Sequence, residues 1–130
     1  VITSASPSDF PALVPGMSTQ RPLTSPDITF YGQDGAIAVP AQDTKAFLGK
    51  ATAAAMTLGA PKLSVNGVEL VITSQTAAAH VITATALLNA GSAGSPLSTA
   101  TFAAQIGASV SLVAQNGQWN VVSTNGVTFT

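Results

Sequence analysis

Prolines are concentrated near the start of this 130-residue chain and restrict what that part of it can form. Six of the eight prolines lie in the first 40 residues, namely Pro7, Pro11, Pro15, Pro22, Pro26 and Pro40. Each proline lacks a backbone donor and disfavours helical geometry in the residue before it, so this spacing excludes a helix and an interior strand. We therefore predict an extended arm over residues 1–35 and a separate domain over residues 36–130.

The predicted arm carries more apolar side chains than a solvated linker, because disordered segments are usually poor in such residues. An extended segment with apolar side chains every few residues is suited to lie along a protein surface. We predict that this surface belongs to another protein, although such an arm can also wrap its own domain. The predicted partner-binding residues are Phe10, Leu13, Val14, Leu23, Ile28, Phe30 and Tyr31.

Asn-Gly pairs dominate the pattern of the remaining residues. The three pairs are Asn66-Gly67, Asn116-Gly117 and Asn125-Gly126, each beside β-branched or aromatic residues. Asn-Gly favours the type I′ turn of a two-residue hairpin, because both central residues of that turn need a positive φ. A hairpin at each pair predicts a mostly β domain of antiparallel hairpins or a meander, which forms a small sandwich or barrel.

The register of the predicted hairpins can be worked out from their turns. A two-residue loop at Asn116-Gly117 places Ala114 opposite Trp119 and Val110 opposite Ser123, which separates an apolar face from a polar one. Trp119 is therefore expected in the core rather than on a ligand-binding surface. Folding back at Asn125-Gly126 would place Val122 opposite Phe129 on the polar face. The C-terminal strands would then carry apolar side chains on both faces. We therefore predict that a second layer of the chain or a neighbouring subunit covers the second face.

Charged residues are scarce, at 7% of the chain against about 25% in typical soluble proteins. No basic patch is available to displace counterions, so we expect no nucleic-acid binding. A neutral surface does little to keep free monomers apart, which favours a subunit of an assembly over a neutral secreted or surface domain. We expect no membrane span, because no run of about 18 apolar residues occurs. No signal peptide is expected either, since the first residues lack a basic region and an apolar region.

Candidate groups for chemistry are few. The chain has no cysteine, which excludes disulfides and thiolate metal sites. His80 is the only imidazole, and Thr52–Leu58 recurs as Thr76–Ile82, which aligns His80 with the apolar Met56. We therefore expect a structural or interface histidine. The acidic residues show no metal-binding or paired-carboxylate spacing, and nucleophile-elbow and phosphate-binding motifs are missing. We predict a protein that is not an enzyme and has no catalytic residue, metal site or cofactor.

The β domain resembles a module of small virion structural proteins in tailed bacteriophages, notably head decoration (cement) proteins. The resemblance covers residues 36–130. The segments that carry it are Val71–Ser74, Thr76–His80, Leu87–Asn89, Ala100–Ala104, Gly107–Ala114 and the Asn-Gly-x-Trp hairpin within Asn116–Ser123.

This resemblance implies a trimer that binds the major capsid protein on the capsid exterior, after assembly in the cytoplasm of a bacterial host. It also implies that extended arms tie neighbouring capsid subunits together, although residues 1–35 match no motif of the family. Two alternatives remain open. One is a phage tail-fibre or receptor-binding β module, which a glycan bound near Trp119 would favour. The other is a small secreted glycan-binding or hydrolase domain, which would bring His80 close to Asp34, Asp43 or Glu69.

Overall fold

The computed structural model describes residues 27–90 and 94–130, and these residues form a mostly β fold, as predicted. Ten strands and one short 3-10 helix, Leu63–Val65, make up its regular structure within these ranges. The strands are β1 (Asp27–Tyr31), β2 (Gly35–Ile37), β3 (Thr44–Leu48), β4 (Ala55–Leu58), β5 (Glu69–Ser74), β6 (Val81–Asn89), β7 (Leu97–Phe102), β8 (Ser109–Gln115), β9 (Gln118–Asn125) and β10 (Val127–Phe129). Strand β1 lies within residues 1–35, the range expected to form the arm, and β2 starts at the last residue of that range. The sheet therefore begins at Asp27.

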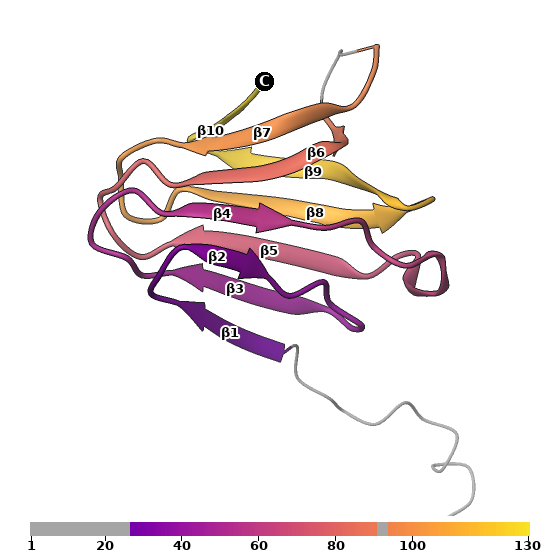
Figure 1. The fold of residues 1–130 in the computed structure, drawn as a ribbon, viewed down its shortest axis with the longest axis horizontal. Helices are drawn as coiled ribbons and strands as arrows, with labels where there is room; N and C mark the ends of the chain where they lie inside the picture. The colour runs from indigo at the N-terminus through magenta and orange to yellow at the C-terminus, as the bar shows by residue number, and fades with distance from the viewer. Residues whose placement is uncertain (1–26, 91–93) are drawn as a thin grey trace, which may run out of the picture.

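The first six strands form three successive coils: β1 with β2, β3 with β4, and β5 with β6. Strands β1, β3 and β5 pair in parallel, and so do β2, β4 and β6. Figure 1 shows the two sets as two layers whose strands run in opposite directions. Thr44 pairs with Leu70 and Ala55 with Val81, so the second and third coils are related by a separation of 26 residues. Parallel neighbours need a long crossover connection, and here each crossover contains a strand of the opposite layer.

The last four strands close the sheet into a barrel shape. The β8–β9 hairpin lies between β5 and β6: β8 is antiparallel to β5, and β9 is parallel to the end of β6. The first part of β6 also pairs with β4 and β7. The register of the β6–β7 pair shifts between Thr83 and Leu88, a stretch that contains Ala86, whose φ is 54°. Among the described strands, β10 has β7 as its one partner. The barrel is nearly closed, and its main sheet path ends at β1 on one side and β2 on the other.

The predicted hairpin at Asn116-Gly117 is confirmed. Asn116 has a φ of 52° and Gly117 a φ of 75°, as a type I′ turn requires. Ala114 faces Trp119 and Leu112 faces Val121, as the two-residue loop predicts. Beyond these pairs a bulge adds a residue to β9, so Val110 faces Thr124 rather than the predicted Ser123.

The other two predicted hairpins are wrong, because longer-range partners replace the local ones. Asn66-Gly67 follows the 3-10 helix and leads into β5, which pairs with β3 and β8. The Asn66 side chain instead accepts a hydrogen bond from the Asn116 backbone N–H at 3.0 Å. At Asn125-Gly126 the chain leaves β9 and pairs with β7, which places Phe129 opposite Ala100 rather than Val122.

Trp119 is fully buried in the core, as predicted. Its indole N–H donates to the carbonyl of Gly59 at 2.9 Å, so the polar end of the ring is also satisfied. Buried side chains alternate along the strands around it, and Leu70 and Ile72 of β5 show the period of two that fills a barrel interior. The ring is therefore unavailable as a stacking surface for a ligand.

Replacing Gly117 by alanine tests the turn at the tip of β8 and β9. An added Cβ would meet only Leu63 Cδ2 at 3.7 Å, an ordinary contact, so backbone strain alone decides the effect. We expect Gly117→Ala to lower the free energy of unfolding by about 1–2 kcal/mol, measured by urea denaturation. Gly32→Ala is the control, because nothing lies within 4 Å of its added Cβ and its φ lies outside the left-handed region. Equal effects of the two substitutions would contradict the turn assignment.

Candidate functional site

The predicted partner-binding residues fall into two groups. Phe10, Leu13, Val14 and Leu23 lie outside the described residues, whereas Ile28, Phe30 and Tyr31 belong to β1. Ile28 is 59% exposed and Phe30 is 68% exposed, and alternate positions of a strand face the same side. Tyr31 is partly buried, and its hydroxyl oxygen accepts a hydrogen bond from the Ala38 N–H at 3.0 Å. The structure therefore brings Ile28 and Phe30 together and separates Tyr31 from them.

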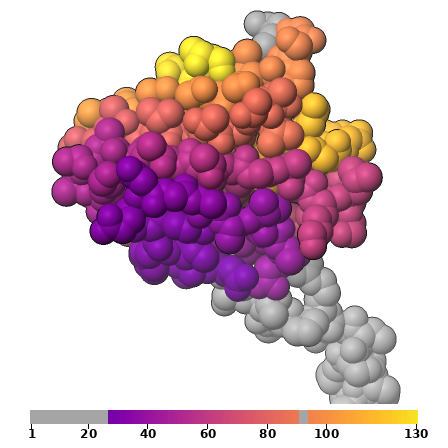
Figure 2. Space-filling view, in the orientation of Figure 1, coloured from indigo at the N-terminus to yellow at the C-terminus, as the bar shows by residue number. Residues whose placement is uncertain are grey.

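Phe47 is a surface aromatic residue that the sequence reasoning missed. It faces Phe30 in the parallel β1–β3 pair, and the two rings stack with their centroids 5.3 Å apart. The signal for it was the alternation in β3, where Phe47 lies between the buried Ala46 and Leu48. Ile28, Phe30 and Phe47 form an aromatic patch on β1 and β3. In Figure 2 the indigo and purple N-terminal strands gather on one side of the molecule, away from the yellow C-terminus.

Strand β1 is also an open edge of the sheet. Within residues 27–90 and 94–130 its only strand neighbour is β3. Natural edge strands are usually protected by proline, bulges or several charges, but β1 has only Asp27 at its start. The hydroxyl oxygen of Thr29, in the middle of β1, is buried without a hydrogen-bond partner in the described part of the chain. The aromatic patch thus lies beside a row of backbone groups that can pair with another extended segment.

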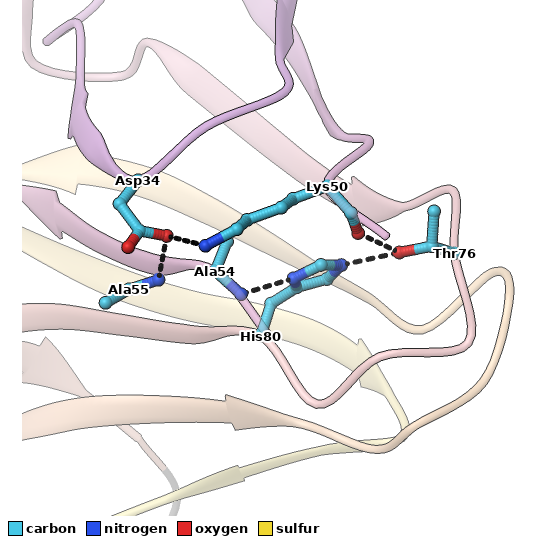
Figure 3. Close-up of polar contacts among 6 residues, drawn as sticks. All are labelled: Asp34, Lys50, Ala54, Ala55, Thr76 and His80. Carbon is cyan, nitrogen blue, oxygen red and sulfur yellow. Dashed lines mark hydrogen bonds and ion pairs between the residues drawn. The ribbon is translucent and has the colours of Figure 1, made fainter. Parts of the chain in front are cut away.

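His80 belongs to a second group of polar residues, at the corner where the second and third coils meet (Figure 3). Its side chain is fully buried. The Ala54 backbone N–H donates to His80 Nδ1 at 3.0 Å, and His80 Nε2 lies 3.0 Å from Thr76 Oγ1. Thr76 Oγ1 in turn donates to the carbonyl of Lys50 at 2.7 Å. His80 and Thr76 therefore fasten the third coil to the residues 26 positions earlier in the chain.

These contacts determine the state of the imidazole. A backbone N–H can only donate, so Nδ1 must accept from Ala54. The single hydroxyl proton of Thr76 goes to Lys50, so Nε2 must carry the proton that it donates to Thr76 Oγ1. His80 is therefore neutral and protonated on Nε2. Burial lowers the pKa of His80, and the positive charge of Lys50 lowers it further.

An ion pair on the surface fastens the residue beside Ala54. Asp34 Oδ1 lies 2.8 Å from Lys50 Nζ and accepts a hydrogen bond from the Ala55 N–H at 3.0 Å. The hydrogen bond from Lys50 lowers the pKa of the Asp34 carboxyl group, and the Ala55 N–H lowers it further. Asp34 and His80 thus hold adjacent backbone N–H groups at the start of β4.

This corner offers little for catalysis. Both ring nitrogens of His80 are used by Ala54 and Thr76, so no carboxylate is hydrogen-bonded to the imidazole. The described residues contain no group of three His, Cys, Asp or Glu side chains that could hold a metal ion. Among the same residues, no helix has the length and apolar character to cross a membrane. The hydrogen bonds of the corner join two coils of the barrel, which is a structural role.

No protein-family model matches the chain, and no curated protein matches it.

Proposed function

We propose that this chain is a non-catalytic virion structural protein, a capsid decoration protein that binds the outer surface of a phage capsid and stabilises it. The observation that carries the proposal is the aromatic patch on the open edge of β1, immediately after the proline-rich residues 1–26. Two exposed apolar side chains, a stacked Phe47 and unpaired backbone groups are features of a surface that binds protein. The resemblance of residues 36–130 to decoration proteins supplies the class of partner.

Burial of protein surface is the source of stabilisation in this proposal. A standard interface buries about 800 Å² on each partner, and many copies on one shell multiply its effect without any chemical step. Few charges then need to be desolvated, since charged residues make up only 7% of the chain. The major capsid protein is the proposed partner, a homotrimer the proposed assembly, and the capsid exterior the proposed location.

Removal of residues 1–26 tests this function. The cut is placed at residue 26 because β1 begins at Asp27 and belongs to the sheet. We expect the truncated protein to keep its β circular dichroism spectrum and its cooperative melting, but to lose binding to capsids assembled without the protein, measured by co-sedimentation. A binding loss of at least about 100-fold is expected, because several apolar contacts are removed together.

A full-length variant separates the apolar side chains from the mere presence of the arm. Phe10, Leu13, Val14 and Leu23 are all replaced by serine, and every proline is kept. We expect this variant to bind as weakly as the truncated protein. Full capsid binding by the truncated protein would overturn the proposed function.

A further inference from the structure

We propose that His80 is an acid-sensitive latch: protonation of its imidazole releases the segment Lys50–Ala55 from residues Thr76–His80 while the rest of the barrel stays folded. This inference does not depend on the proposed function. It rests on the hydrogen bonds at the corner of the second and third coils, which are drawn in Figure 3.

The geometry of Nδ1 makes the contact sensitive to acid. Protonation adds a hydrogen to Nδ1, which then faces the Ala54 N–H across 3.0 Å. Two donors cannot share a hydrogen bond, and the Ala54 N–H has no acceptor function with which to adapt. Nε2 cannot take the role of the acceptor either, because it already donates to Thr76 Oγ1. The cation therefore requires Ala54 to move away from the ring.

The surroundings of His80 offer the cation no compensation. Its side chain is fully buried, and a buried charge is costly unless it is paired. Strand β6, which follows His80, and its two neighbours β4 and β7 carry no ionisable side chain. Lys50, from the connection after β3, repels the cation. Asp34, from the connection between β1 and β2, is already paired with Lys50.

Release of the segment is favoured below the ordinary pKa of histidine. The pKa of His80 lies below 6.5 when the corner is closed, and it returns toward 6.5 when the corner opens to water. The open form therefore binds the proton, so the stability of the closed corner is complete above pH 6.5 and is lost as the pH falls below that value. Asp34 responds separately, because its pKa lies below 3.8 and its contacts persist until the solution is more acidic.

Local release also fits the way the segment is attached. Lys50–Ala55 connects β3 to β4 on the surface, and its exposed residues include Ala51, Thr52 and Ala53. Its hydrogen bonds at this corner are those to Thr76, His80 and Asp34, together with the bond from the Val81 N–H to the Ala54 carbonyl. Ala54 is the one residue of the segment that is buried in the core. Segments with few buried apolar contacts open at lower free energy than the core.

Amide hydrogen exchange of the full chain, followed by NMR from about pH 7.5 to about pH 4.5, tests the latch. After correction for intrinsic exchange rates, we expect protection of the Ala54 amide to fall as the pH drops below 6.5, with a slope of at most about tenfold for each pH unit. The Ile72 amide, in the middle of the buried β5, should keep its protection over the same range. Parallel changes at Ala54 and Ile72, or no change at Ala54, would overturn the inference.

Two variants give matched controls. His80→Asn keeps an oxygen acceptor near the position of Nδ1 but does not titrate, so the Ala54 protection should no longer depend on pH. Asp34→Asn removes the ion pair with Lys50 and leaves His80 in place, so the acid-dependent loss at Ala54 should remain. An acid-dependent loss that persists in His80→Asn would overturn the assignment to His80. The comparison of Ala54 with Ile72 in the unmodified protein remains decisive even if a variant fails to fold.

Discussion

Replacement of Trp119 by alanine is expected to lower the free energy of unfolding by about 3–5 kcal/mol, the range for an aromatic side chain truncated in a core. The indole is fully buried and lies opposite Ala114, whose small side chain leaves room for it. Truncation would open a cavity between the hairpin and the rest of the barrel. It would also remove the hydrogen bond that the Gly59 carbonyl accepts from the indole N–H. Urea unfolding followed by circular dichroism measures the change.

Trp119→Phe separates the two contributions. Phenylalanine restores most of the apolar volume but cannot donate to the Gly59 carbonyl, so we expect a smaller loss of about 1–3 kcal/mol. This variant is also the fallback if Trp119→Ala does not fold. A loss below about 1 kcal/mol for the alanine variant would show that Trp119 does not anchor the core.

Replacement of both Ile28 and Phe30 by serine is expected to reduce capsid binding by about 30-fold or more while the protein stays folded. A buried aromatic anchor at the centre of an interface is typically worth about 2 kcal/mol or more. Both side chains are mostly exposed in the free chain, so their loss costs little folding stability beyond the stacking of Phe30 on Phe47. Co-sedimentation with capsids and a thermal melt measure the two effects separately.

Val122→Ser is the matched control for the aromatic patch. Val122 is 60% exposed, close to Ile28 in exposure, but it lies on β9 and is separated from β1 by three other strands of the sheet. We expect this variant to bind like the unmodified protein. Equal binding losses at Val122 and at the aromatic patch would point to a general effect of surface polarity and would contradict a role for β1.

The sequence allowed prediction of the local part of the fold. Asn116-Gly117 determines its own turn through positive φ angles, and the flanking alternation then sets the pairs nearest the turn. Prediction failed where a strand chose between a near and a distant partner. Asn66-Gly67 and Asn125-Gly126 are equally good turn sequences. However, β5 pairs with β3 and β8, and β10 pairs with β7, instead of forming the local hairpins. Turn chemistry carries no information about such partners.

The internal repeat of the sequence differs from the repeat of the coils. The repeat aligned His80 with Met56, whereas the structure pairs Met56 with Ile82 and puts Ala54 against the imidazole. Met56 and His80 are nevertheless both buried. The hydrogen bonds of His80 were unpredictable from the sequence, since they join residues on two coils.

Two of the three residues of the aromatic patch, Ile28 and Phe30, were singled out from the sequence, and Phe47 was not. Ile28 and Phe30 stood out as apolar residues in a proline-rich region, but that reasoning treated them as part of an arm rather than as a strand of the sheet. Phe47 belongs to the patch only because β1 and β3 pair in parallel, which brings it against Phe30. A pattern within one segment cannot show which residue of another segment lies beside it.

The position of the β8–β9 hairpin governs the order in which the chain can fold. Strands β5 and β6 bind the hairpin rather than each other, so the barrel cannot close before residues 109–125 are available. During synthesis strands β1 to β7 leave the ribosome before this hairpin, so the earlier coils must wait with their interior side chains exposed to water. Closure then joins segments that are far apart in sequence, which is a slow step in β proteins. Closure of the barrel should therefore wait for this hairpin, and a chain that still lacks it exposes interior side chains that favour aggregation.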